Sequence, residues 1–285
     1  MIRCLVTGAR GKLGQSLLTC ARARGVTAAA FQGDIAEPGD VARALDDLQP
    51  DCVVNAAAFT AVDRCESEPQ RAWRSNAEGP GVLARACAPS VLLLHLSTDY
   101  VFSGEPGERP HEDTPPEPLN EYGCSKLAGE GAVRDAAGEH LIVRTQWLFG
   151  PGPSFVEAVL ERARHGEPLR VVRDEVGRPT WTDDLAGGLL DVAAAGLRGT
   201  LHLANQGEAS RWELACEVVR GGCERGWNRD VPVEPIERSE LGRPAVRPGH
   251  AVLDLGRALR AGIELPHWRD ALRGYLDQRA KGDRT

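Results

Sequence analysis

The sequence of 285 residues predicts an α/β fold: a doubly wound parallel β-sheet followed by a smaller, partly interleaved C-terminal domain. Short apolar runs alternate with segments of helical periodicity over the first 150 residues, a glycine-rich turn follows the first run, and the alternation loosens beyond residue 150. Continuous apolar strands are typical of parallel sheets that helices cover on both faces. Because crossovers between parallel strands are right-handed, we expect a doubly wound sheet.

Hydrophobic periodicity gives the elements in order. Apolar runs predict strands at residues 2–6, 26–31, 52–55, 91–96 and 141–144. Apolar residues at helical spacing predict helices at residues 13–23, 41–48, 72–86 and 122–134. Five prolines between residues 103 and 120 exclude a helix there, so we expect a long loop, and loops of this length are often functional.

The second half continues with weaker periodicity. It predicts helices at residues 155–164, 182–195, 212–220 and 268–278, strands at 169–172 and 199–203, and a proline-broken stretch at 231–248. We expect residues 1–149 to form the first domain, joined by about 171–204. Residues 150–170 and 205–285 are expected to form the second.

Composition limits the function classes. The hydrophobic fraction of 42% excludes a disordered chain. The net charge of −7 leaves no positive field that would attract the whole protein to nucleic acid or to an anionic membrane. No apolar run approaches the roughly 20 residues of a membrane span, and no secretory leader is recognisable. The eight cysteines form no C-x-x-C pair. We therefore expect a cytoplasmic protein without nucleic-acid or membrane partners.

The glycine-rich turn TGARGKLG follows the first predicted strand and opens the first predicted helix. Gly8 permits a tight turn, Gly11 permits close approach of a pyrophosphate, and Gly14 lets the helix pack on the strand. The helix N-terminus offers N–H groups to phosphates. This context predicts a Rossmann-type dinucleotide-binding domain, and the alternative is a flexible loop in an ordinary α/β protein.

The choice of dinucleotide depends on the second strand. NAD sites usually have a carboxylate at the end of that strand, whereas here the carboxylate comes only at Asp34, after Phe31 and Gln32. Arg10, inside the glycine-rich turn, is suited to a 2′-phosphate. This favours NADPH and leaves NADH possible, unless Arg10 is merely a solvated loop residue.

Tyr122 and Lys126 lie four residues apart, on one face of a predicted helix. An ammonium near a phenol lowers the pKa of the phenol, which can then give its proton to a carbonyl oxygen as hydride arrives from a nicotinamide. Thr98 follows the fourth predicted strand, at the edge where parallel sheets bind ligands. Its hydroxyl can hydrogen-bond the carbonyl of the substrate and hold it against Tyr122. The alternative readings are a surface i,i+4 pair and a hydroxyl that caps the strand.

Together these segments resemble the dTDP-4-dehydrorhamnose reductase family, the nucleotide-sugar 4-ketoreductase branch of the extended short-chain dehydrogenases/reductases. The resemblance runs through nearly the whole chain. Its most specific strings are STDYVF at 97–102 and YGCSKLAGE at 122–130, and RTQW at 144–147 and GRPT at 177–180 extend it.

The resemblance implies an NADPH-dependent reductase of a dTDP-4-dehydro-6-deoxyhexose, active as a monomer or homodimer, with a C-terminal sugar-nucleotide-binding domain. It makes Thr98, Tyr122 and Lys126 the catalytic triad. With the glycine-rich turn, it predicts a cofactor site of Gly8, Arg10, Gly11, Lys12, Leu13, Gly14, Asp34, Ile35, Ala56, Ala57, Ala58, Tyr122 and Lys126. The implied substrate-binding residues are Thr98, Asp99, Tyr100 and Trp147.

Four departures from the family pattern lie toward the substrate domain and concern the identity of the sugar. They are Pro110, Ser154 before Phe155, Glu175 after Asp174, and the string RPGHA at 247–251. Some members hold a bridging metal through a glutamate shortly after the last glycine of the turn. Gln15 and Ser16 stand there instead, so we expect no metal.

Three alternatives remain open at this level. One is a sugar-nucleotide 4,6-dehydratase or epimerase of the same superfamily, although a dehydratase needs an Asp-Glu pair and Asp99 is followed by Tyr100. A catalytically silent regulatory subunit, like that of methionine adenosyltransferase, shares the ancestry but does not need the complete triad. A ketoreductase for another deoxysugar, in antibiotic tailoring, fits the same motifs.

Overall fold

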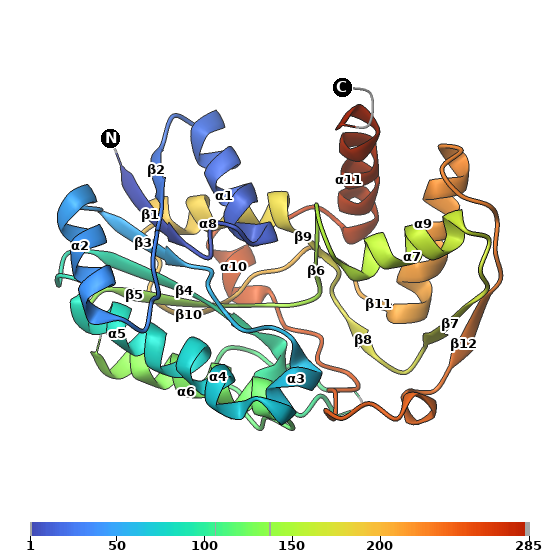
Figure 1. The fold of residues 1–285 in the computed structure, drawn as a ribbon, viewed down its shortest axis with the longest axis horizontal. Helices are drawn as coiled ribbons and strands as arrows, with labels where there is room; N and C mark the ends of the chain where they lie inside the picture. Colours follow the sequence, from blue (N-terminus) through green and yellow to red (C-terminus); the bar gives the residue numbers. More distant parts are fainter. Residues whose placement is uncertain (1, 106, 137, 283–285) are drawn as a thin grey trace.

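The computed structural model describes residues 2–105, 107–136 and 138–282. Its centre is a six-stranded, fully parallel sheet in the order β10-β5-β4-β3-β1-β2 (Figure 1). The strands are β1 (Arg3–Thr7), β2 (Thr27–Ala30), β3 (Cys52–Asn55), β4 (Leu92–Thr98), β5 (His140–Thr145) and β10 (Gly199–His202). The predicted α/β fold with a doubly wound parallel sheet is thereby confirmed.

Helices cover both faces of the sheet (Figure 1). On one face α1 (Lys12–Ala23) and α8 (Thr182–Ala194) pack against alternate residues of the strands, including Cys4 and Val6. On the other face Leu5 meets the side covered by α2 (Pro38–Leu48), α5 (Gly79–Ala86) and α6 (Glu121–Ala136). Because successive strand residues point to opposite faces, an unbroken apolar run fills two cores.

The region predicted as one helix at residues 72–86 is interrupted. It consists of α4 (Pro69–Trp73), a π-helical turn at Arg74–Glu78 and α5, and it is preceded by a short α3 (Val62–Ser67) that the periodicity did not predict. The π-turn carries Asn76, whose buried amide bonds both backbone groups of Phe59 and the hydroxyl of Ser125. The irregular turn therefore carries a buried polar contact that joins the loop at Phe59 to α6.

The C-terminal unit packs α7 (Phe155–Arg164), α9 (Arg211–Glu224) and α11 (Trp268–Gly282) around the buried Trp268. Short strand pairs join these helices: β7 (Leu169–Val172) with β12 (Val233–Ile236), β8 (Val176–Gly177) with β11 (Ala209–Ser210), and β6 (Leu148–Phe149) with β9 (Thr180–Trp181). A short α10 (Gly256–Arg260) packs beside β10.

The chain crosses between the two units several times. Residues of α8 and β10 lie with the central sheet, although they follow β7 in the sequence. The predicted boundary near residue 171 falls inside β7, which pairs with β12 of the C-terminal unit. Among the helices that the structure describes, none has the length and apolarity needed to cross a membrane.

A buried ion pair fastens α6 to the sheet. Arg144 of β5 donates to both carboxylate oxygens of Glu130, at 2.9 and 2.7 Å, and the Ser97 hydroxyl donates to the same carboxylate at 2.6 Å. Glu130 and Arg144 are almost inaccessible to solvent. When one partner of such a pair is removed, the other is left as an uncompensated buried charge.

We therefore expect Arg144→Ala to lower the free energy of unfolding by about 3–5 kcal/mol, measured by urea denaturation. Glu68→Gln, which breaks solvent-accessible pairs with Arg64 and Arg71, is the control and is expected to change the midpoint little. Equal effects of the two variants would contradict the assignment of Glu130–Arg144 as a structural pair.

Candidate active site

A cavity of about 430 Å³ opens at the carboxyl ends of β1, β2 and β3. The strand order reverses at this point, with β2 on one side of β1 and β3 on the other, and such a switch point is where open α/β sheets bind ligands. Of the residues that the sequence predicts for the cofactor, Gly8, Arg10, Gly11, Asp34, Ile35, Ala57 and Ala58 line the cavity. Sequence reasoning missed Ala9, Phe31, Gln32, Gly33 and Ser75.

The glycine-rich turn has no space for side chains at two of its glycines. Gly8 has a φ of +62°, and a Cβ there would lie 2.6 Å from the carbonyl of Ala56, behind the cavity wall. A Cβ on Gly14 would lie 2.3 Å from the carbonyl oxygen of Gly8. The turn is held by a bond from the Gly11 amide to Gly8, at 2.8 Å. This cradle has the form that a dinucleotide pyrophosphate needs.

Two predicted cofactor residues point elsewhere. The ammonium of Lys12 donates to the carbonyl of Pro153 at 2.6 Å, and burial lowers its pKa. Leu13 belongs to the hydrophobic core beneath α1. The structure therefore brings neither side chain to the cavity.

Two charged residues at the rim of the cavity, Asp34 and Arg10, differ in whether they have bonding partners. The carboxylate of Asp34 accepts from the Ala36 amide and from Arg74, both at 2.9 Å, and these bonds lower its pKa. Arg10 is exposed, and among the residues that the structure describes its guanidinium has no hydrogen-bond or ion-pair partner. Arg10 is thus the rim cation available to a ligand.

The predicted triad lies where α6 meets the end of β4. The hydroxyl of Thr98 accepts from the Tyr100 amide, so it caps the short turn at Asp99–Val101 that follows the strand. The ring of Tyr122 packs edge-on against Tyr100, with centroids 5.4 Å apart. Gly123 makes this contact possible, because a Cβ there would lie 2.2 Å from the Tyr100 carbonyl oxygen.

Burial governs the acid–base properties of Tyr122. Loss of solvent raises the pKa of its phenol, and a hydrogen bond with Thr98 only partly offsets this. The charges of Asp99 and neighbouring groups act in the same direction as burial. The phenol is therefore fully protonated at neutral pH, the state that a proton donor requires.

Lys126 is buried, and its ammonium donates to the carbonyl of Leu96 at 2.6 Å. Burial lowers the pKa of Lys126 to about 8, and the nearby charge of Glu130 opposes the shift. The sequence led us to expect that this ammonium would lower the pKa of Tyr122. In the structure the ammonium bonds to the strand instead, and burial of the phenol dominates its pKa.

Asp99 is also buried, and loss of solvent raises its pKa to about 6. Its carboxylate accepts from the Thr98 hydroxyl at 3.0 Å and from the Gln146 amide at 3.3 Å. Gln146 additionally bonds the backbone of residues 251 and 253, so it ties the C-terminal segment to the end of β4. The sequence contained Gln146 in a family string but gave no role for it.

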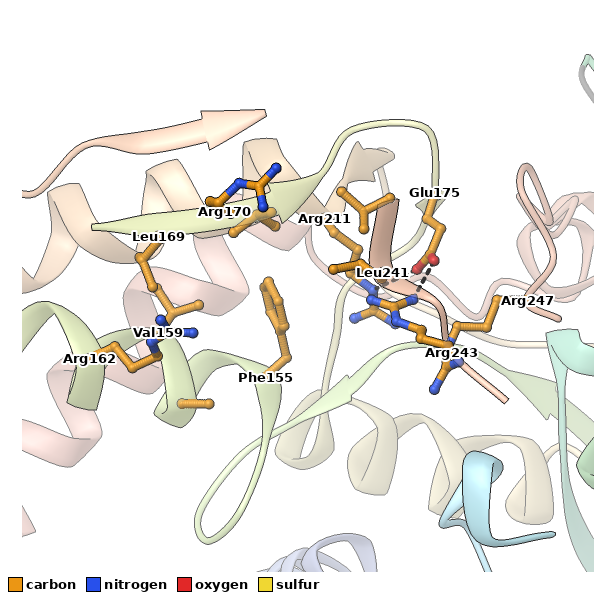
Figure 2. Close-up of a pocket in the computed structure, with 13 residues that line it drawn as sticks. Phe155, Val159, Arg162, Leu169, Arg170, Glu175, Arg211, Leu241, Arg243 and Arg247 are labelled. Carbon is orange, nitrogen blue, oxygen red and sulfur yellow. Dashed lines mark hydrogen bonds and ion pairs between the residues drawn. The ribbon is translucent and has the colours of Figure 1, made fainter. Parts of the chain in front are cut away.

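A second cavity, of about 390 Å³, lies between α7, β7 and the segment 241–247 (Figure 2). Arginines dominate its polar lining, namely Arg162, Arg170, Arg211, Arg243 and Arg247. Arg211 connects it to a predicted substrate residue, because its guanidinium lies 3.6 Å from the ring centroid of Trp147. Trp147 itself has a φ of +51° and packs against Gly177, where a Cβ would approach the indole to 2.6 Å.

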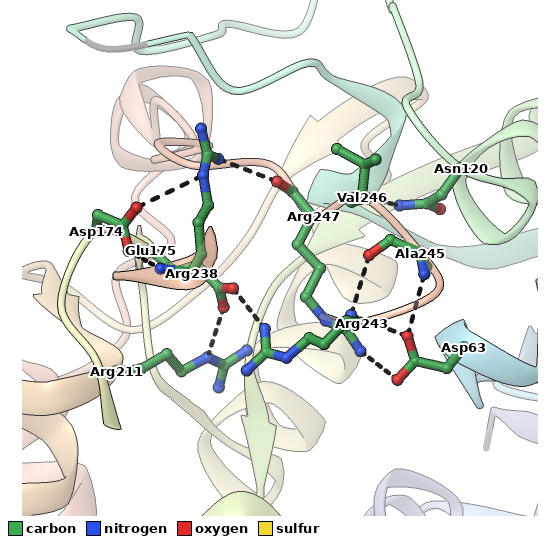
Figure 3. Close-up of polar contacts among 10 residues, drawn as sticks. All are labelled: Asp63, Asn120, Asp174, Glu175, Arg211, Arg238, Arg243, Ala245, Val246 and Arg247. Carbon is green, nitrogen blue, oxygen red and sulfur yellow. Dashed lines mark hydrogen bonds and ion pairs between the residues drawn. The ribbon is translucent and has the colours of Figure 1, made fainter. Parts of the chain in front are cut away.

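The segment 243–247 also bridges the two units (Figure 3). Arg247 donates to both carboxylate oxygens of Asp63 in α3, at 3.0 and 2.8 Å, and this bond lowers the pKa of Asp63. Asn120 bonds the carbonyl of Val246 at 2.7 Å. Within the described ranges, no group of three or more potential metal ligands is found.

One family model matches nearly the whole chain. The model of the RmlD substrate binding domain matches residues 2–281. A dTDP-4-dehydrorhamnose reductase of Streptomyces griseus is 44% identical over 283 residues, covering 95% of this chain and 91% of that protein.

Two solved structures are similar over the same length. A dTDP-4-dehydrorhamnose reductase of Clostridium acetobutylicum superposes with a TM-score of 0.92 at 35% identity, covering 98% of this chain and 100% of that one. A dTDP-4-dehydrorhamnose reductase of Bacillus anthracis in complex with NADP gives a TM-score of 0.91 at 31% identity, covering 97% of this chain and 99% of that one.

The tight contact at Gly8 makes a testable prediction. Gly8→Ala should weaken binding of NADPH by about tenfold or more, because the added Cβ must displace the backbone of Ala56 and strains a left-handed residue. Fluorescence titration with NADPH measures the effect. Gly39→Ala, where a Cβ meets nothing within 4 Å, is the control, and equal affinity of the two variants would exclude the cradle as the dinucleotide site.

Proposed function

The chain belongs to the RmlD substrate binding domain family, and from this we propose that it catalyses NADPH-dependent reduction of the 4-keto group of a dTDP-4-dehydro-6-deoxyhexose. The leading reaction is conversion of dTDP-4-dehydro-L-rhamnose to dTDP-L-rhamnose. The observation that carries the proposal is that Thr98 and Tyr122 lie at the carboxyl end of β4. The glycine cradle lies at the same edge of the sheet, after the carboxyl end of β1.

The cradle suits a dinucleotide because its glycine backbone leaves room and its helix offers amide donors. NADPH, when bound, supplies the hydride that adds to the sugar carbon. The 2′-phosphate is assigned to Arg10, the rim cation without a partner among the described residues, while Asp34 is engaged by Arg74. This assignment favours NADPH over NADH.

Tyr122 is the proton donor in this proposal. Its protonated phenol gives a proton to the carbonyl oxygen of the sugar as the C4 carbon accepts hydride, so the ketone becomes a secondary alcohol and the phenol becomes a phenolate. Thr98 lies beside the phenol, and its hydroxyl donates to the same oxygen when it turns away from the carboxylate of Asp99, to which it donates at 3.0 Å in the structure. The ammonium of Lys126, one helical turn from Tyr122, donates to the carbonyl of Leu96, and in this proposal its remaining hydrogens bind the cofactor beside the phenol.

The nucleotide diphosphate is assigned to the arginine-lined cavity. Guanidinium groups bind phosphate oxygens in a bidentate manner, and the cavity offers several of them. Stacking of Arg211 on Trp147 connects this cavity with the sugar side, where Trp147 and Tyr100 are assigned to the hexose. A substrate that spans both places positions its C4 carbonyl at Tyr122.

Two other readings of the motifs lack support. Dehydration needs an acid at the position of Tyr100, and a silent regulatory subunit does not need the complete set of Thr98, Tyr122 and Lys126. We further propose that the enzyme is cytoplasmic, since its eight cysteines are all free thiols and its cofactor is an intracellular reductant. A monomer or homodimer remains our prediction for its assembly.

NADPH oxidation against a panel of dTDP-4-keto-6-deoxyhexoses tests the function. We expect turnover with dTDP-4-dehydro-L-rhamnose, and a higher kcat/KM with NADPH than with NADH. Tyr122→Phe should lower kcat by about 10²–10⁴ while leaving the Kd for NADPH nearly unchanged, because only the donated proton is lost. Full activity of Tyr122→Phe would exclude the assigned role.

The pH dependence of the reaction follows from Lys126. Its pKa is lowered from 10.5 to about 8, so the ammonium is present below pH 8 and is lost as the pH rises. Tyr122 has a raised pKa and stays protonated over the same interval. We expect kcat/KM for ketone reduction to fall above about pH 8 and the fall to move to higher pH in Lys126→Arg; a rate that is constant to pH 10 would contradict this.

A further inference from the structure

We propose that Glu175 is a positioning residue that aims Arg211 and Arg243 into the arginine-lined cavity and limits how tightly that cavity holds the substrate's diphosphate. This inference rests on the proposed function, which assigns the diphosphate to the cavity.

Glu175 lies in the turn between β7 and β8 and is only 4% exposed. Its carboxylate accepts from the guanidinium of Arg243 at 2.5 Å, and the other oxygen lies 4.0 Å from the Nε of Arg211 (Figure 3). The carbonyl of Glu175 also accepts from the Arg211 amide, at 3.1 Å. Glu175 therefore contacts, through its carboxylate and its backbone carbonyl, two arginines that come from separate segments, α9 and the bridging segment 243–247.

The two arginines depend on Glu175 to different degrees. Arg211 is held independently by Trp147, at 3.6 Å from the ring centroid, and by Phe155, at 5.3 Å. For the side chain of Arg243, the described residues offer no hydrogen-bond or ion-pair partner other than Glu175. Arg243 keeps 30% of its side-chain surface exposed and Arg211 keeps 20%, so both remain accessible to a ligand.

Glu175 also lowers the net positive charge of the residues that line the cavity. The other lining arginines pair with carboxylates that do not line it: Arg247 with Asp63, Arg170 with Glu240, and Arg162 with Glu167. Among the described lining residues, Glu175 is the acidic one (Figure 2). A diphosphate that contacts Arg243 must therefore approach a carboxylate of the same sign, and this repulsion weakens its binding.

Positioning and repulsion can be separated because glutamine has the shape of glutamate without its charge. In Glu175→Gln the amide oxygen can still accept from Arg243, while the stacking on Trp147 and the backbone bond still hold Arg211. The arginines keep their places and the repulsion is removed. In Glu175→Ala both the charge and the anchor of Arg243 are lost.

The experiment measures the Kd for dTDP by isothermal titration calorimetry. We expect Glu175→Gln to bind dTDP about three- to tenfold more tightly than the parent chain, with a KM for the sugar nucleotide that falls in the same ratio and an unchanged KM for NADPH. Glu175→Ala should bind dTDP less tightly than Glu175→Gln. Glu161→Gln, which removes an exposed charge on α7 outside the cavity lining, is the control and should match the parent chain.

The possible failures are distinguishable. If dTDP binds the parent chain and Arg243→Ala weakens it, but Glu175→Gln binds no more tightly than the parent, the role of Glu175 is wrong and the assignment of the cavity stands. If Arg243→Ala binds dTDP as the parent does, the cavity does not hold the diphosphate, and this part of the proposed function fails together with the inference. Thermal unfolding of each variant verifies that it is folded.

Discussion

The close packing of α6 against the end of β4 is the constraint on which the candidate site depends. The helix approaches so closely that a Cβ on Gly123 would lie 2.2 Å from the Tyr100 carbonyl oxygen, and one on Gly129 would lie 2.0 Å from the carbonyl oxygen of Asn76. Lys126 fastens this contact through its bond to Leu96. Any looser packing would let water reach Tyr122 and would remove the burial that controls its pKa.

Burial, rather than pairing of charges, therefore gives each group at the end of β4 its protonation state. It keeps Tyr122 protonated, brings the pKa of Lys126 to about 8 and that of Asp99 to about 6. Tyr122 is therefore a neutral proton donor, whereas Lys126 and Asp99 change their charge at a pH near neutrality. At the arginine-lined cavity the balance differs: Arg211 and Arg243 stay partly exposed, and the carboxylate of Glu175 lies against both.

Local sequence determined the parts of this protein whose geometry is local. Unbroken apolar runs specify strands buried on both faces, and a glycine-rich turn between strand and helix specifies a cradle, since only glycine adopts the φ of Gly8 without strain. The spacing of Tyr122 and Lys126 places them on one helix face. The family strings then point to the reductase family, and the match over residues 2–281 agrees.

Tertiary structure alone decided where long side chains point and what surrounds them. Lys12 sits in the glycine-rich turn, yet its ammonium reaches Pro153, and Lys126 bonds to a strand rather than setting the pKa of Tyr122. Arg211 and Arg243 belong to no recognisable motif and meet at Glu175 only because α9 and the segment 243–247 converge there. Periodicity and spacing encode backbone geometry, whereas desolvation and ion pairing depend on neighbours that are distant in the chain.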